Sequence, residues 1–373
     1  MKICHIGNIN CIHLQNIINH FQDEGHNNML LSLSRPSSLD RRESLNADVR
    51  VQYVGPCNGR RYWSPDFWLS RYSAARHVKQ YVHEYTPDIL HAYYITDSGL
   101  LGTYSGFHPF VIFAIGSDGL IDLKKSHLKS LTIQHSIKTA DRVLCYSKDL
   151  RDALCTNEHI KSKTKYIRNG VDCGTFKRTA PDKDLMTSLR LDKKHKIIIS
   201  LRNFAPVYNI DCLIKSVPDV VHAVPEARFL IIGEGVLEQE LKELAKRTGA
   251  MEYIRFHPVI PNAHLPAYIN LATVYVSTSI SDGMSFSLLE AMACEKPVVA
   301  TAIPANERVI EHKINGLLYE GGNPVDLGEK LAALLRNEKA HAKMGRQNRK
   351  HVLEQYNFSD FMENVAESFR QLI

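Results

Sequence analysis

Residues 282–301 read Asp-Gly-Met-Ser-Phe-Ser-Leu-Leu-Glu-Ala-Met-Ala-Cys-Glu-Lys-Pro-Val-Val-Ala-Thr, an acid and a glycine loop followed by an apolar helix with a second acid and a proline-led strand. Gly283 can take a backbone conformation closed to other residues, so we expect a sharp turn there. The turn would present the free amides of Met284, Ser285 and Phe286 to an anion at the helix start. The stretch therefore predicts a diphosphate site in front of a helix.

The two acids of this stretch, Asp282 and Glu290, lie about two helical turns apart. They could bracket a bound sugar nucleotide, with Asp282 at the hexose end and Glu290 at the ribose end. An N-capping Asp and a solvent-facing Glu on an ordinary packing helix would have the same spacing. The acids alone leave both interpretations open.

The same stretch resembles the signature of retaining glycosyltransferases with the GT-B fold, specifically glycosyltransferase family four (the group 1 glycosyltransferases), where an acid, seven residues and a Glu precede AMA and PVVAT. The resemblance runs along nearly the whole chain. Its other pieces are residues 1–8, 25–26, 88–92, 116–118, 169–172 with Phe176, 200–202, 233–235, 306–307 and 315–318. The order and spacing of these pieces together are specific.

The resemblance implies a donor site in the second half of the chain. Its catalytic residues would be Arg202 for the diphosphate, Asp282 for the sugar and Glu290 for the ribose. Further donor contacts are implied for Tyr208, Gly233, Gly235, Gly283, Met284, Ser285, Phe286 and Leu289. Cleavage of a sugar–diphosphate bond leaves negative charge on the phosphate, and Arg can hold phosphate by two parallel hydrogen bonds. Gly233 and Gly235 alone would indicate only a strand-ending turn.

Three positions depart from the family pattern. Tyr208 stands where the family usually has a Lys, and its hydroxyl can donate a hydrogen bond to phosphate but brings no charge. Another cation, such as Lys313 or a residue of the first half, would then have to substitute. Asp282 replaces the commoner Glu and is one methylene shorter, and Ile115 stands where the family often has His or Trp.

The first half offers candidates for the acceptor or the transferred sugar. Asn8, Asn10 and His13 follow the first predicted strand and could line the cleft that holds the sugar. His91 is predicted to end a strand that points at the same cleft. Asp118 is a further candidate ligand for acceptor or sugar hydroxyls, and a helix N-cap is its equally good alternative.

Composition is typical of a soluble globular protein, with 44% hydrophobic and 23% charged residues, and the 373-residue length suits two domains. No apolar run approaches the roughly 20 residues of a membrane span, and residues 3–6 are too short for a signal core. The eight cysteines form no Cys-x-x-Cys pair, which favours a reducing cytoplasm and argues against zinc. We therefore expect a cytoplasmic protein with no metal cofactor and with the nucleoside diphosphate sugar as co-substrate.

Positive charge is concentrated in the first half, since residues 1–180 carry a net charge of +7 and the remainder −1. In the GT-B fold the first half faces the acceptor, so the asymmetry favours an anionic acceptor or the inner face of an anionic membrane. The candidate contacts are Arg41, Arg42, Arg60, Arg61, Lys124, Lys125 and Lys129, with Leu120, Ile121, Leu123 and Leu128 interleaved. A solvated basic helix face explains each cluster equally well. We do not expect nucleic acid as a partner, because no series of aromatic residues accompanies the basic ones.

Short β-rich runs alternate with helix-length segments in two sets, which predicts an α/β protein with two Rossmann-like domains. In the GT-B arrangement their parallel sheets face a central cleft. The domains would be residues 1–180 with a returning helix at 357–373, and residues 181–356, with the junction between Phe176 and Lys193. Strands are predicted at 2–6, 29–32, 51–53, 89–92, 110–114, 142–146, 196–201, 228–233, 253–256, 273–277, 297–300 and 316–319. Helices are predicted at 338–355 and 358–373.

A dehydrogenase is the rival function for such a fold, but the first strand is followed by Gly7 alone rather than by three spaced glycines. We predict a metal-independent retaining hexosyltransferase that uses a UDP- or GDP-sugar and a glycan or lipid-linked acceptor. It would act in envelope or capsular polysaccharide synthesis at the inner face of the membrane. Two alternatives remain: a non-catalytic sugar-nucleotide-binding partner subunit, and a GT-B epimerase or phosphorylase.

Overall fold

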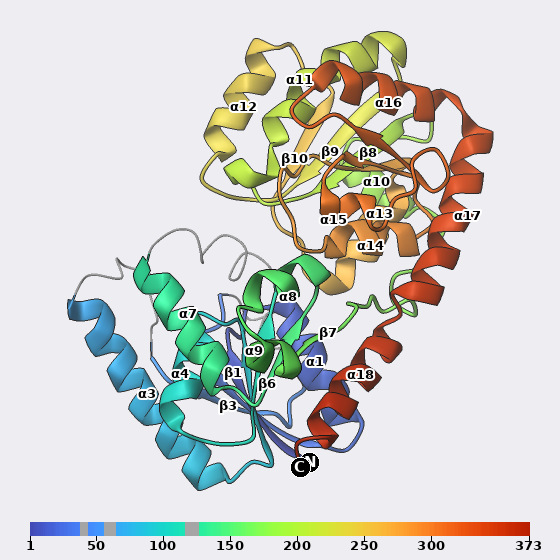
Figure 1. The fold of residues 1–373 in the computed structure, drawn as a ribbon. Coiled ribbons are helices and arrows are strands. Elements are labelled where there is room, and N and C mark those ends of the chain that lie inside the picture. Colours follow the sequence, from blue (N-terminus) through green and yellow to red (C-terminus); the bar gives the residue numbers. More distant parts are fainter. Residues whose placement is uncertain (38–43, 56–64, 116–126) are drawn as a thin grey trace. The chain divides into compact units, whose positions relative to one another are not determined.

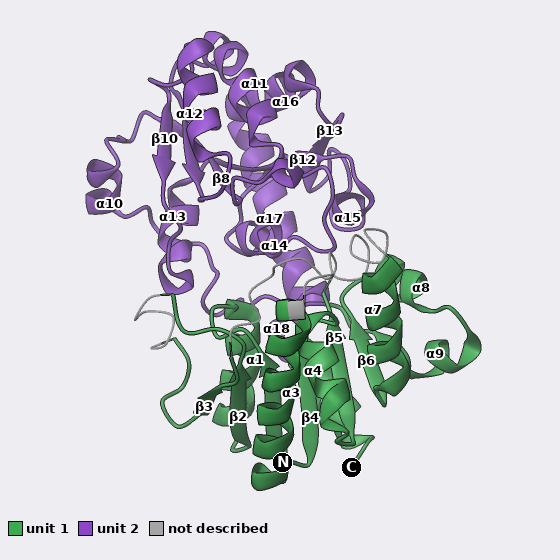
Figure 2. Cartoon of the chain, turned by 90° about the vertical axis from the view of Figure 1, so that its left-hand side faces the viewer, with its two compact units in different colours: residues 1–168, 360–373 green, residues 169–359 purple. Residues whose placement is uncertain are grey.

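The computed structural model describes residues 1–37, 44–55, 65–115 and 127–373. They form two compact units (Figure 2). Unit 1 consists of residues 1–168 and 360–373, and unit 2 consists of residues 169–359. The last helix of the chain thus belongs to unit 1 for most of its length.

Unit 1 is built on a seven-stranded parallel sheet in the order β3-β2-β1-β4-β5-β6-β7 (Figure 1). Its strands are β1 (Lys2–Gly7), β2 (Asn27–Ser32), β3 (Arg50–Tyr53), β4 (Ile89–Tyr93), β5 (Phe110–Ala114), β6 (Arg142–Cys145) and β7 (Thr164–Tyr166). Its helices are α1 (Ile12–Asp23), α3 (Pro65–Tyr85), α4 (Asp97–Ser105), α7 (His127–Thr139), α8 (Lys148–Leu154), α9 (Glu158–Lys163) and α18 (Phe358–Arg370). Every residue of β4 and β5 is buried, as expected for parallel strands covered on both faces.

Unit 2 repeats this design with a six-stranded parallel sheet in the order β10-β9-β8-β11-β12-β13. Its strands are β8 (Lys196–Leu201), β9 (Ala227–Ile232), β10 (Ile254–His257), β11 (Val274–Ser277), β12 (Val298–Thr301) and β13 (Gly316–Tyr319). Its helices are α10 (Lys183–Ser188), η1 (Pro206–Tyr208), α11 (Ile210–Ala223), α12 (Glu238–Arg247), η2 (Asn262–His264), α13 (Leu265–Leu271), α14 (Phe286–Ala293), α15 (Pro304–Glu307), α16 (Pro324–Arg336) and α17 (Glu338–Gln355). In both sheets the strand order reverses beside the first strand, which is where doubly wound folds bind ligands.

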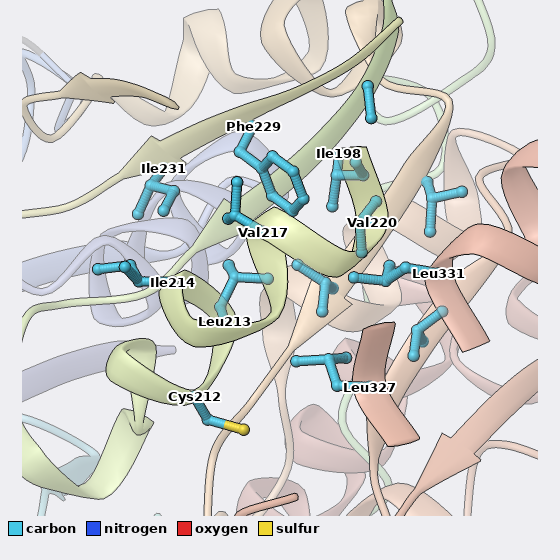
Figure 3. Close-up of a cluster of buried hydrophobic side chains, with 14 of the residues drawn as sticks. Ile198, Cys212, Leu213, Ile214, Val217, Val220, Phe229, Ile231, Leu327 and Leu331 are labelled. Atoms are coloured by element: carbon cyan, nitrogen blue, oxygen red, sulfur yellow. The ribbon is translucent and has the colours of Figure 1, made fainter. Parts of the chain in front are cut away.

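The core of unit 2 shows why its helices lie where they do. The apolar sides of α11 and α16 meet over one face of the sheet, as Figure 3 shows for Leu213, Val217 and Leu331 around Ile198 and Phe229. Each of these side chains is at most 1% exposed. Burial of a large apolar side chain contributes about 1.5 to 3 kcal/mol, so this layer fixes the orientation of β8 and its carboxyl end.

The returning helix α18 packs into unit 1 through its aromatic residues. Phe369 stacks on Phe21 of α1 with ring centroids 5.5 Å apart, and the Phe361 ring lies 5.8 Å from that of Tyr146. Both phenylalanines are at most 3% exposed. Helix α18 therefore completes the core of unit 1 even though it is separated from the rest of that unit in sequence.

The predicted α/β fold with two parallel sheets is confirmed, and each predicted strand has a counterpart. The unpredicted strand is β7, which has only three residues, Thr-Lys-Tyr, and so carries no apolar pattern. The division between the units falls after Arg168, upstream of the predicted junction, because Val171 and Phe176 pack in a core cluster of unit 2. Arg349 of α17 holds the same segment by donating a hydrogen bond of 2.9 Å to the Cys173 carbonyl.

Candidate functional site

Polar residues of unit 2 converge at the carboxyl ends of β8 and β11, the two strands on either side of the reversal in strand order. Arg202 follows the last residue of β8, and Ser277 is the last residue of β11. Asp282 and Ser285 lie in the segment between β11 and α14. Parallel neighbours end at the same edge of a sheet, so these side chains reach one another.

Arg202 is the centre of this cluster. Its Nη2 atom donates hydrogen bonds to Asp282 Oδ2 at 2.8 Å, to Ser277 Oγ at 3.4 Å and to Ser285 Oγ. The side chains of Arg202 and Asp282 are 11% and 16% exposed, so the ion pair is largely buried. The structure thus joins two of the three predicted catalytic residues directly.

The surroundings keep Arg202 charged. Burial lowers the pKa of the guanidinium, but Tyr275, Asp282 and Tyr208 raise it by more, so the net shift of the Arg202 pKa is upward. Its Nε atom is buried and has no hydrogen-bond partner among the described residues. A buried donor without an acceptor costs free energy, so the site favours a ligand that supplies one.

Tyr208 lies at the end of η1 and faces Arg202 with its ring. The guanidinium carbon is 5.3 Å from the ring centroid, a distance suited to a cation–π contact. The Tyr208 carbonyl accepts a hydrogen bond of 2.7 Å from Thr278 Oγ1, which fixes η1 to the end of β11. Tyr208 therefore belongs to the cluster, and its aromatic face is the part that meets the cation.

The start of α14 differs in detail from its prediction. Ser285, not Asp282, is the N-cap, and its Oγ accepts a hydrogen bond of 3.2 Å from the Leu288 amide. Gly283 does not have a positive φ, so the predicted special conformation is wrong. The chain turns instead through the extended backbone of Ser285, at φ −83° and ψ 102°. The amides of Met284 and Ser285 donate to no acceptor within the described ranges, so both can still bind an anion.

Glu290 is buried in α14, with 7% of its surface exposed, and is not the solvent-facing Glu of the alternative interpretation. Burial raises the pKa of Glu290 to about 7, although the nearby Arg202 charge lowers it. Its carboxyl group has no hydrogen-bond partner among residues that the structure describes. An unpaired buried acid close to a buried cation is a common sign of a functional site.

Gly233 and Gly235 allow the loops after β8 and β9 to touch. A Cβ atom on Gly233 would lie 2.2 Å from the Arg202 carbonyl oxygen, and one on Gly235 would lie 2.6 Å from the Phe204 carbonyl oxygen. The Phe204 amide also donates a hydrogen bond of 2.8 Å to the Glu234 carbonyl. These glycines therefore hold the backbone of Arg202 in place, and this close approach accounts for them without any ligand.

The remaining predicted donor residues flank the helix start. Leu289 has no exposed surface and packs in a core cluster of unit 2, so its side chain cannot line a donor site. Met284 is 8% exposed and belongs to the same cluster, whereas Phe286 is half-buried. Any donor contact of Met284 would therefore be through its amide, whereas Leu289 of α14 packs in the core.

In unit 1, Asn8 and Asn10 bind the neighbouring loop. Asn8 Oδ1 accepts hydrogen bonds from the Asn10 amide at 2.9 Å and from Ser34 Oγ at 2.5 Å. Asn10 Oδ1 accepts one of 2.7 Å from the Ser37 amide. His13 is half-buried at the start of α1, and desolvation lowers its pKa to about 4. These residues all lie at the carboxyl end of β1, and their assignment to the acceptor or the transferred sugar stays a prediction.

His91 is not at a strand end but in the middle of β4, and it is fully buried. Its Nδ1 atom lies 2.9 Å from Nδ1 of His5, whose Nε2 lies 3.1 Å from Asn28 Oδ1. The rings of Phe113 and Phe369 pack against it. The prediction that His91 faces a cleft is therefore wrong, because Ala92 and Tyr93 extend the strand beyond it.

Several predicted residues lie outside the described residues. They are Asp118, Arg41, Arg42, Arg60, Arg61, Lys124, Lys125, Leu120, Ile121 and Leu123. Lys129 and Leu128 are on α7. In residues 1–37, 44–55, 65–115 and 127–373, no group of three or more His, Cys, Asp or Glu residues could hold a metal ion. The helices within these ranges are all too short or too polar to cross a membrane.

Sequence reasoning missed Ser277 and the position of Ser285 beside the cation. The signal for Ser277 was the polar run Ser277-Thr278-Ser279 directly after an apolar strand, at the sheet edge where sites form. All three are at most 1% exposed. Buried hydroxyls in this place are hydrogen-bonding positions rather than surface loop residues.

Comparison with known proteins gives two family matches that together span most of the chain. Residues 182–351 match the family model "Glycosyl transferases group 1", and residues 2–147 match "Glycosyl transferase 4-like". The first match contains the whole cluster around Arg202. The second contains all of the sheet of unit 1 except β7.

Individual proteins agree with these families. An uncharacterised glycosyltransferase of Methanocaldococcus jannaschii is 24% identical over 76% of each chain. Alpha-monoglucosyldiacylglycerol synthase of Streptococcus pneumoniae is 25% identical over 64% of this chain, which spans only 57% of the length of that relative.

Among solved structures, Anabaena HepE in complex with UDP and glucose superposes with a TM-score of 0.83 and 18% identity over 100% of both chains. Sucrose-phosphate synthase of Thermosynechococcus elongatus gives a TM-score of 0.82 at 17% identity, over 100% of this chain and 99% of that one. These likenesses establish the GT-B fold. The two family matches, over residues 2–147 and 182–351, show that this chain belongs to the group 1 glycosyltransferases, a family that transfers sugars from nucleotide-sugar donors and is typically retaining.

Proposed function

We propose that the chain is a metal-independent retaining hexosyltransferase that moves one hexosyl unit from a nucleoside diphosphate sugar to a glycan or lipid-linked acceptor. The observation that carries the proposal is the buried Arg202, bound to Asp282 and Ser285 beside the unpaired Glu290. This cluster offers one fixed cation for a leaving diphosphate and two carboxylates for sugar hydroxyls.

Each residue has a distinct role in this proposal. Arg202 and the amides of Met284 and Ser285 stabilise the charge that develops on the leaving diphosphate. Asp282 positions the hexose, and Glu290 binds the ribose. The guanidinium is a fixed positive charge in a largely buried site, so it can stabilise the leaving diphosphate in the way that a metal ion does in other transferases.

The acceptor is assigned to unit 1, through Asn8, Asn10, His13 and Asp118. The net charge of +7 on residues 1–180 favours an anionic acceptor or an anionic membrane surface. The pneumococcal relative is a glucosyldiacylglycerol synthase by name, which supports a lipid or lipid-linked acceptor and a role in envelope or capsule synthesis.

The donor is tested first by thermal unfolding with UDP-, GDP- and ADP-sugars, with and without EDTA. UDP-glucose leads the panel because HepE binds UDP and glucose. A donor at 100 times its Kd adds about 2.7 kcal/mol to the free energy of unfolding. We expect stabilisation by one nucleotide class, unchanged by EDTA and lost in Arg202→Ala, while Arg247→Ala on the exposed side of α12 keeps it.

Product analysis then separates the remaining functions. Incubation with the stabilising donor alone yields little free sugar from a transferase, and added acceptor yields an α-configured glycoside from an α-linked donor. Stabilisation without turnover on any acceptor would identify a non-catalytic partner subunit. Conversion of the donor without acceptor would identify an epimerase or, with added phosphate, a phosphorylase.

A further inference from the structure

Unit 1 carries a groove of about 690 Å³ between the C-terminal half of α3 and the segment that follows α4. Arg76, His77, Lys79 and His83 line it from α3, and Gly106 and Phe107 line it from the other side. Figures 1 and 2 show these two helices side by side. The volume lies within the range of about 300 to 1,000 Å³ that is usual for small-molecule sites.

The charge of the groove is one-sided. Its lining includes an Arg, a Lys and two His residues but no carboxylate. None of these four side chains forms an ion pair or a side-chain hydrogen bond with another residue in the described part of the chain. The neighbouring acid on α3, Glu84, instead accepts a hydrogen bond of 2.8 Å from Gln80.

His83 lies in the last turn of α3, but ordinary helix stabilisation does not account for Arg76 and Lys79. Basic residues offset the helix dipole when they lie in the last turn of a helix. Helix α3 ends at Tyr85, and Arg76 and Lys79 lie before its last turn. Elsewhere on α3, the buried Arg71 is paired with Asp97 at 2.6 Å. The buried cation of α3, Arg71, is therefore neutralised by an acid, whereas Arg76 and Lys79 face an open groove.

The groove lies away from the predicted acceptor residues of unit 1. Helices α3 and α4 lead into β4 and β5, so their C-terminal ends lie at the amino edge of the sheet. Asn8 and Asn10 follow the carboxyl end of β1, which is parallel to β4. The groove and these asparagines therefore lie at opposite edges of one sheet.

We propose that this groove is a second binding site, specific for a phosphate-bearing ligand. Arg76 would hold the phosphate through paired N–H donors, Lys79 would add a point charge, and His77 and His83 would add hydrogen bonds. Phe107 and Val82 give the groove an apolar wall for the rest of the ligand. The site stands independently of the donor site in unit 2.

A phosphate group can reach this groove on a soluble molecule or on a lipid head group. The rate of acetylation of individual lysines on the intact chain, measured by mass spectrometry, shows whether the groove is occupied. Lys79 lines the groove, and the exposed Lys138 of α7 is the matched reference. The probes are pyrophosphate, phosphatidylglycerol vesicles and phosphatidylcholine vesicles. Pyrophosphate at the donor site does not interfere, since the readout is residue-specific.

We expect pyrophosphate to slow acetylation of Lys79 at least about fivefold and to leave Lys138 nearly unchanged, as a bound ligand shields only its own site. Arg76→Gln, an exposed substitution, removes this protection. Protection by phosphatidylglycerol alone, with neither phosphatidylcholine nor pyrophosphate effective, assigns the phosphate to a lipid head group. The proposal fails if no probe protects Lys79, if Lys138 is protected equally, or if Arg76→Gln retains the protection.

Discussion

The two units carry parallel sheets of the same winding, yet the polar residues at their strand ends behave differently. In unit 2, Arg202 binds Asp282 and Ser285, which are 80 and 83 residues away in sequence. In unit 1, Asn8 and Asn10 bind the 34–37 loop within 27 residues of sequence. A polar strand end indicates chemistry most strongly when it joins distant segments around a buried donor that lacks a partner, as Arg202 Nε does, because stabilisation of a local loop needs neither feature.

Replacement of the central cation should produce the largest effect. Arg202→Ala should lower kcat/KM, with a loss of about 3 to 4 kcal/mol of transition-state stabilisation. One preorganised donor to a developing charge contributes about this much. Steady-state kinetics with the donor found by thermal unfolding measures it. Arg247→Ala is the control, and near-normal turnover of Arg202→Ala would remove the distinction between the two units.

The substitution Gly233→Ala should have the next largest effect and lower the free energy of unfolding by about 2 to 4 kcal/mol. The added Cβ atom would lie 2.2 Å from the Arg202 carbonyl oxygen. Gly328→Ala is a suitable control, since its Cβ would meet nothing closer than 3.6 Å. Denaturant unfolding compares the two variants. Equal stability would show that the loops after β8 and β9 are not held by this contact.

Acid should weaken unit 1 through its buried imidazoles. Burial lowers the pKa of His5 to about 4, and burial with the neighbouring His5 lowers that of His91 well below its ordinary 6.5. The unfolded chain therefore binds more protons below pH 6.5, so stability falls as pH drops from 6.5 toward 4, by on the order of 2 kcal/mol.

Hydrogen exchange of β1 and β4 across this pH range measures that loss. His91→Phe should reduce the pH dependence, whereas His222→Gln, an exposed substitution in α11, should not. An unchanged pH dependence in His91→Phe would show that the His5–His91 pair does not set the acid sensitivity of unit 1.

The smallest effect concerns Glu290, whose pKa burial raises to about 7. If its carboxylate accepts the ribose hydroxyls, donor affinity should rise about fivefold as pH increases from 6 to 8 and the group ionises. Calorimetric titration with the intact sugar nucleotide measures this. Glu290→Gln should bind more weakly at pH 8 and lose the dependence, and a wild-type affinity that stays flat would contradict the ribose role.

Sequence periodicity was sufficient for most of the fold because strands of a covered parallel sheet are nearly continuous apolar runs. It failed for β7, whose three residues contain no such run, and at the unit boundary, where Val171 and Phe176 join a core whose other members lie far along the chain. Long-range packing of that kind leaves no local pattern.

For the site, the residue types were predictable but their pairing was not. Arg202, Asp282 and Glu290 were recognised by motif, whereas the Arg202–Asp282 bond and the capping role of Ser285 depend on how β8 and α14 meet. The position of His91 was predicted wrongly because the sequence near a strand end does not show whether a histidine faces a loop or the core. The pair with His5 is fixed by the β1–β4 register, in which these residues are direct partners.

The Arg202–Asp282 pair has a consequence for selectivity. The guanidinium is already ion-paired with a carboxylate that is only 16% exposed, so a phosphate that binds the free Nε atom has to share the cation with Asp282. A bare phosphate places a second anion beside that carboxylate, whereas a sugar nucleotide also brings hydroxyl groups that can donate hydrogen bonds to Asp282. We therefore expect the cluster around Arg202 to bind a ligand that carries both an anion and a sugar more tightly than a simple phosphate.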